Sequence, residues 1–119
     1  MAGKLTLVGL GDGSLANLTL AAEAALKKAT AIVGYRSYLN LVKKLGFNSQ
    51  FYAFGMKQEQ ERALKALSLA SQGEEVVLVC SGDAGIYGMA GLALELAQQK
   101  QVNVEITVLP GVTAALAVA

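Results

Sequence analysis

The sequence predicts an α/β fold, a five-stranded, mostly parallel sheet flanked by helices. Short apolar runs rich in β-branched residues alternate with segments of helical length, a pattern typical of βαβ units. The run 75–79 is apolar from Val76 onward, as expected for a strand buried on both faces of a parallel sheet. A length of 119 residues fits one such domain, here expected over 1–119.

The elements follow one another in a regular order. Strands are expected at residues 4–8, 31–33, 51–54, 75–79 and 104–109. Helices are expected between them, over 18–29, 37–45, 57–71 and about 89–99. Gly9 and Gly34 are expected to end the first two strands, and Thr19 is the predicted N-cap of the first helix. An apolar helix is expected to start at 114–119, after a turn at 110–113.

Composition narrows the possible functions. The hydrophobic share is 54% and the charged share 16%, so some apolar surface is expected to lie against a second domain or subunit. The net charge is +1 without a dense basic cluster, and we expect no nucleic-acid partner. Catalysis by Ser-His-Asp or Cys-His is excluded because the chain has no histidine, and with a single cysteine we expect no metal site. Neither a signal peptide nor a membrane-length apolar run is present, so we expect a cytoplasmic protein without a membrane partner.

The segment 80–88, Cys-Ser-Gly-Asp-Ala-Gly-Ile-Tyr-Gly, follows the most buried predicted strand. Ligands of open α/β sheets bind at the carboxyl ends of strands. Glycines let a ligand approach the backbone, and the Asp83 carboxylate suits a hydroxylated or cationic ligand. The segment therefore predicts a binding loop around Gly82 and Asp83; the alternative is a plain turn in which Asp83 caps the next helix.

Two other loops follow predicted strands. The first carries Gly11 and Gly13, but Ser14 stands where a dinucleotide-binding fingerprint requires glycine, and the second strand lacks the acidic residue at its end. We therefore expect a close-approach backbone surface there and no NAD site. The second of these loops carries Tyr35 and Arg36, whose side chains suit the carboxylate of a large, flat anion. The alternative is a turn at the start of a helix with surface tyrosines.

Four segments together resemble the tetrapyrrole methylase family. They are 8–13, 33–38, 81–91 and 110–114, which occur in the family's order over essentially the whole chain. Within the family, 34–38 and 85–91 are most similar to the precorrin-3B C(17)-methyltransferases. The resemblance implies two α/β domains with S-adenosylmethionine in the cleft between them. This chain resembles the first domain and is expected to end near the connection to a second.

The resemblance also implies roles for individual residues. Cofactor contacts are expected from Leu10, Gly82, Asp83, Ile86, Thr113 and Ala114. Substrate contacts are expected from Gly11, Gly13, Tyr35 and Arg36. No catalytic acid or base is assigned. The chain departs from the family at Asp12 and Ala84, where relatives often carry proline.

The activity implied is methyl transfer from S-adenosylmethionine to a ring carbon of precorrin-3B or cobalt-factor III, with ring contraction, in cobalamin biosynthesis. The expected partner is a small tetrapyrrole, and self-association, as a homodimer or through surface left by a missing domain, is expected. We expect this chain to be an incomplete portion, inactive by itself. The alternatives are another precorrin or diphthine methylase, a non-catalytic half-domain, and a flavodoxin-like binding module.

Overall fold

The computed structural model describes residues 3–10 and 18–110 and contains a five-stranded sheet in the order β3-β2-β4-β1-β5. All paired strands are parallel. The strands are β1 (Lys4–Gly9), β2 (Ala31–Tyr35), β3 (Gln50–Phe54), β4 (Glu75–Cys80) and β5 (Glu105–Leu109). The helices are α1 (Leu20–Lys28), α2 (Arg36–Lys44), α3 (Glu59–Ser71) and α4 (Asp83–Lys100). The predicted fold class is confirmed.

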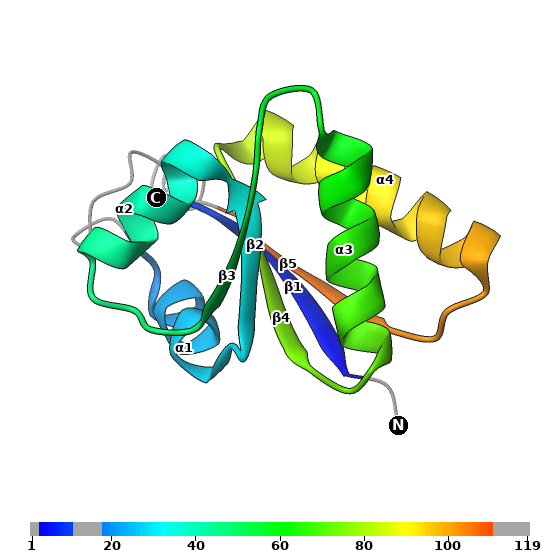
Figure 1. Ribbon diagram of the computed structural model, residues 1–119, viewed down its shortest axis with the longest axis horizontal. Coiled ribbons are helices and arrows are strands. Elements are labelled where there is room, and N and C mark those ends of the chain that lie inside the picture. The colour runs from blue at the N-terminus through cyan, green and yellow to red at the C-terminus, as the bar shows by residue number, and fades with distance from the viewer. Residues whose placement is uncertain (1–2, 11–17, 111–119) are drawn as a thin grey trace, which may run out of the picture.

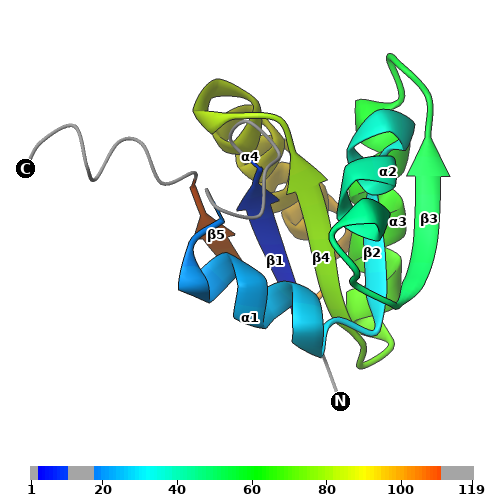
Figure 2. The same cartoon turned by 90° about the vertical axis from the view of Figure 1, so that its left-hand side faces the viewer.

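The sheet lies between two helical layers. In Figure 1, α1 and α2 cover one face of the sheet and α3 and α4 cover the other. Alternate residues of each strand supply the two cores: in β4, Leu78 and Cys80 pack under α3 and α4, whereas Val77 and Val79 pack under α1 and α2. Figure 2 shows the strands side by side, with their carboxyl ends along one edge.

The helices that follow two neighbouring strands lie on opposite faces of the sheet. The central strand β4 leads into α4 on one face, while its neighbour β2 leads into α2 on the other face. Two adjacent strands whose connections diverge in this way leave a crevice at their carboxyl ends, which is the usual ligand position in open α/β sheets. The topology therefore places a binding crevice beside the ends of β2 and β4.

The end of the second strand differs from the prediction. β2 continues through Gly34 to Tyr35, and α2 begins at the next residue, Arg36. Gly34 is buried, and a Cβ there would lie 3.3 Å from the side chains of both Leu39 and Val79. Gly34 therefore allows α2 to pack closely on the sheet and does not mark a turn.

The segment after β4 also differs from the prediction. α4 begins at Asp83 instead of residue 89, so the expected binding loop is only a short bend followed by a helix. Ile86, Met89, Ala93 and Leu96 are buried at helical spacing, and this apolar stripe holds the segment against the sheet. The glycines of this segment lie in the first turns of the helix.

The predictions for the other helix starts were mixed. Thr19 is the N-cap of α1, as predicted, and its Oγ1 accepts a hydrogen bond from the Ala22 N–H at 3.0 Å. α3 begins at Glu59, two residues later than predicted, because Lys57 has a left-handed φ of 64° that a right-handed helix excludes.

The surface carries several large apolar side chains. Leu20, Met56, Tyr87 and Leu94 are all more than half exposed. None of the helices that the structure describes is long and apolar enough to cross a membrane. The predicted turn at 110–113 falls outside the described residues except for Pro110, and the predicted helix at 114–119 falls outside them entirely.

Candidate functional site

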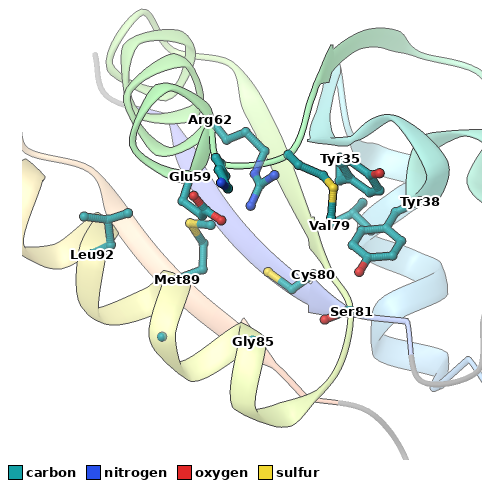
Figure 3. Close-up of a pocket in the computed structure, with 13 residues that line it drawn as sticks. Tyr35, Tyr38, Glu59, Arg62, Val79, Cys80, Ser81, Gly85, Met89 and Leu92 are labelled. Carbon is teal, nitrogen blue, oxygen red and sulfur yellow. The ribbon is translucent and has the colours of Figure 1, made fainter.

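A pocket of about 460 Å³ opens at the carboxyl ends of β2 and β4, between α3 and α4. Its apolar lining comes from Met56, Val79, Cys80, Met89 and Leu92. Its polar lining comes from Tyr35, Tyr38, Lys57, Glu59, Arg62 and Ser81. Gly85 and Gly88 complete one wall along α4. The pocket thus occupies the crevice that the strand order creates, and Figure 3 shows its lining.

The turn between β3 and α3 forms one rim of the pocket. Gly55 N–H donates to Gln58 Oε1 at 2.6 Å, and this bond fixes the turn. Lys57 sits in the turn with φ at 64°, a conformation that non-glycine residues rarely adopt. The turn holds Met56 and Lys57 at the pocket, and the first turn of α3 then adds Glu59 and Arg62.

The opposite rim is the N-terminus of α4. Gly82 is its N-cap, and no side chain of the described part of the chain caps the helix. Among the residues that the structure describes, none lies within 4 Å of a Cβ built on Gly82 or Gly88, and that part of the chain leaves space in front of the backbone there. Free amide groups at a helix start, beside open backbone, suit the polar groups of a ligand. This arrangement fits a cofactor that approaches the chain closely.

Charge in the pocket is unevenly balanced. Two cations, Lys57 and Arg62, face one anion, Glu59. Burial raises the pKa of the Cys80 thiol from its ordinary value of 9.0 to about 12, and the Arg62 charge lowers it by a smaller amount. The Cys80 thiol is therefore protonated at neutral pH and serves as apolar lining, since only the thiolate is a strong nucleophile.

Two tyrosines close the side of the pocket nearest α2. Tyr35 at the end of β2 and Tyr38 in α2 are half-buried and pack edge to face, with ring centroids 5.3 Å apart and planes at 69°. Such pairs are favourable, and they leave the hydroxyl groups available for hydrogen bonding. The predicted alternative of surface tyrosines in a turn does not describe this geometry.

The structure brings together only some of the residues predicted for the site. Tyr35 lines the pocket, and Gly82 and Asp83 start α4 directly beside the pocket residue Ser81. Arg36 is exposed and does not line the pocket; its guanidinium would lie 3.9 Å from a Cβ on Gly55.

The predicted cofactor residues Leu10 and Ile86 are buried in opposite cores, at 2% and 0% exposure. The Leu10 N–H donates to the Cys80 carbonyl at 3.0 Å, which places the start of the first glycine loop beside the end of β4. Cofactor contact by either residue stays a prediction. Other expected site residues lie outside the described part of the chain: Gly11, Asp12, Gly13, Thr113, Ala114 and the side chains of Asp83 and Ala84.

Sequence reasoning missed the charged residues of α3. Glu59 and Arg62 belong to the polar side of an amphipathic helix, which is normally a solvated surface. Lys57 was expected at the start of a helix, and no site role was expected for Met56. Whether a polar helix residue faces a pocket depends on how the neighbouring helices pack, and that is a property of the whole fold. Spacing along the chain carries no such signal.

Comparison with known proteins gives a consistent result. A family model described as Tetrapyrrole (Corrin/Porphyrin) Methylases matches residues 4–119. A probable cobalt-factor III C(17)-methyltransferase of Salmonella typhimurium is 46% identical over 115 residues, which cover 97% of this chain and 48% of the relative.

Solved structures show the same fold. The methyltransferase CobJ superposes with a TM-score of 0.79 at 36% identity, covering 98% of this chain and 49% of that one. Uroporphyrin-III C-methyltransferase from Thermus thermophilus, complexed with S-adenosylhomocysteine, superposes with a TM-score of 0.68 at 28% identity, covering 98% and 48%. The chain therefore spans about half the length of these relatives.

Proposed function

Because the chain belongs to the tetrapyrrole methylase family, we propose that it forms one half of an S-adenosylmethionine-dependent methyltransferase. Its substrate is cobalt-factor III or precorrin-3B, and the methyl group is transferred to ring carbon C17 with contraction of the ring. The similarity to the Salmonella typhimurium C(17)-methyltransferase over nearly the whole chain carries this proposal.

The geometry supports a site that binds and orients without acid–base chemistry. S-adenosylmethionine, when bound, supplies an electrophilic methyl group, and an electron-rich macrocycle is itself the nucleophile. Holding two reactants in line supplies roughly 7–11 kcal/mol of the barrier to such a transfer. The chain has no histidine, and its pocket thiol is protonated, which is compatible with a reaction driven by positioning.

Each rim of the pocket has a role in this proposal. The N-terminus of α4, with Gly82 and Asp83, holds the cofactor against open backbone. The tyrosine pair and the charged rim of α3 face the tetrapyrrole. Leu10 and Ile86, together with Thr113 and Ala114, contribute to the cofactor side, and Gly11 and Gly13 to the substrate side, as the family resemblance implies.

The relatives are about twice as long as this chain, and the proposal assigns the other half of their length to a second domain. That domain would close the cleft over the carboxyl edge of the sheet and exclude water. Residues 1–119 alone are then inactive. In its absence, two copies are expected to associate through exposed apolar side chains such as Tyr87 and Leu94. A monodisperse monomer in light scattering would count against association.

The test is a chimera. This chain replaces the matching portion of the Salmonella typhimurium relative. Transfer of the radiolabelled methyl group from S-adenosylmethionine to cobalt-factor III is measured, and the product is identified by its mass. The intact relative is the positive control, and this chain alone is the negative control. We expect a methylated product from the chimera and none from the chain alone. A folded chimera without product, beside an active intact relative, would contradict the proposal.

A further inference from the structure

The half-buried cation Arg62 belongs to the charged rim of α3, for which the proposed function names no specific contact with the substrate. Arg62 lies one turn into α3, and its side chain extends into the space above Cys80 (Figure 3). Among the side chains that the structure describes, no carboxylate lies within 4.0 Å of its guanidinium. A partly desolvated cation without a partner is unfavourable, and an anionic ligand would relieve that cost.

The surrounding groups define the anion. Lys57 adds a second positive charge at the rim and Glu59 subtracts one, so the charged lining is left with one net positive charge. The hydroxyl groups of Tyr35, Tyr38 and Ser81 are hydrogen-bond donors in the same lining. This lining matches one carboxylate group, because it combines one net positive charge, the planar guanidinium of Arg62 with its N–H donors, and nearby hydroxyl groups.

The apolar lining of the pocket indicates the kind of molecule to which the carboxylate is attached. Val79, Met89 and Leu92 line the pocket on the side of β4 and α4, and Met56 lies at the rim. A volume of about 460 Å³ exceeds what one carboxylate needs. The remaining space suits the apolar edge of a large ring from which a short carboxylate arm extends.

We propose that Arg62 binds a peripheral carboxylate of the tetrapyrrole substrate in this pocket, with Lys57 as the second cation. This inference rests on the proposed function and assigns to Arg62 the role that the sequence suggested for Arg36. Arg36 is solvent-exposed at the start of α2 and lies outside the pocket. The residues on which this inference rests lie in this chain, so the chain alone can be tested.

The test is a fluorescence titration of the chain with uroporphyrin, a stable tetrapyrrole whose side arms end in carboxylates. Loss of a charge-assisted hydrogen bond in a partly desolvated site weakens binding about 10- to 100-fold, and we expect this effect for Arg62→Gln. Arg62→Lys keeps the charge but loses the fork, and an intermediate effect is expected. Arg36→Gln and the exposed control Lys44→Gln are expected to change binding by less than about twofold.

Two further measurements separate the possible failures. Thermal unfolding must show that Arg62→Gln is folded, and S-adenosylhomocysteine titrated into the same variant reports the cofactor side alone. Equal uroporphyrin binding by the original chain and Arg62→Gln would overturn the inference, as would a larger loss in Arg36→Gln. So would no uroporphyrin binding by the original chain. With cofactor binding intact, each of these outcomes would leave the proposed function standing.

Discussion

The two faces of the sheet are built differently. Under α1 and α2, large side chains such as Leu26, Leu39 and Val42 are fully buried. Under α3 and α4, large side chains such as Leu78 and Ile86 are also fully buried beside small residues such as Ala66, and a pocket opens between the two helices at the carboxyl edge. We call the face under α1 and α2 the closed face, since the pocket of about 460 Å³ opens on the other face.

A matched pair of leucine truncations should separate the two faces most clearly. Leu39→Ala removes a side chain that is 1% exposed beneath α2, and we expect the free energy of unfolding to fall by about 2–5 kcal/mol. Leu92→Ala removes a half-buried side chain from the pocket wall, where space already exists, and we expect a loss of about 1 kcal/mol or less. Urea unfolding measures both, and equal losses would contradict the difference between the faces.

The pocket thiol should give the second face a pH dependence. The pKa of Cys80 is raised from 9.0 to about 12 by folding, so stability from this group is complete below pH 9 and falls as the pH rises toward 12. The slope approaches about 1.4 kcal/mol per pH unit for one group. Urea unfolding between pH 9 and 10 measures the slope. Cys80→Ala should remove the slope, and the same slope in both proteins would contradict the assignment.

The helix starts on the two faces also differ. α1 on the closed face is capped by Thr19, and Thr19→Ala is expected to lower stability by about 1 kcal/mol. α4 beside the pocket has Gly82 as its N-cap, whose φ of −158° any residue can adopt and whose Cβ position is not blocked by any described residue. Gly82→Ser should therefore raise stability by a few tenths of a kcal/mol while weakening cofactor binding. A Gly82→Ser variant that binds S-adenosylhomocysteine as tightly as the original chain would show that the open backbone is not used.

The left-handed residue at the pocket rim provides a further small effect on stability. Lys57→Gly relieves an unfavourable φ but adds freedom to the unfolded chain, and a net gain of about 0.5 kcal/mol is expected. Gln101→Gly, at the left-handed C-cap of α4, is a matched control with the same backbone change and no place in the pocket. Thermal unfolding should show similar gains for both, whereas only Lys57→Gly should weaken uroporphyrin binding. Loss of uroporphyrin binding in both variants would point to a general effect of the backbone change.

The strands were predicted well from the sequence, because apolar runs rich in β-branched residues indicate buried strands directly. Gly34 was expected to end a strand and Gly82 to lie in a binding loop. In the structure, Gly34 permits close packing of α2 on the sheet, and Gly82 is the N-cap of α4. The segment after β4 could be placed at the edge of the sheet, since a strand end can be identified from local pattern, and its role in cofactor binding stays a prediction. The role of Arg62 in the pocket was not predicted, because its position depends on the β3–α3 turn and on the packing of α3 beside α4.

The central claim is that the carboxyl edge of this sheet binds the methyl-donor cofactor, and a calorimetric titration with S-adenosylhomocysteine tests it most directly. Asp83→Asn alters the acid at the start of α4, and Glu23→Gln alters the acid in the first turn of α1 on the closed face. We predict binding by the original chain and by Glu23→Gln, and binding at least about tenfold weaker in Asp83→Asn. A folded chain that binds no S-adenosylhomocysteine, or that binds it equally well after Asp83→Asn, would contradict the account.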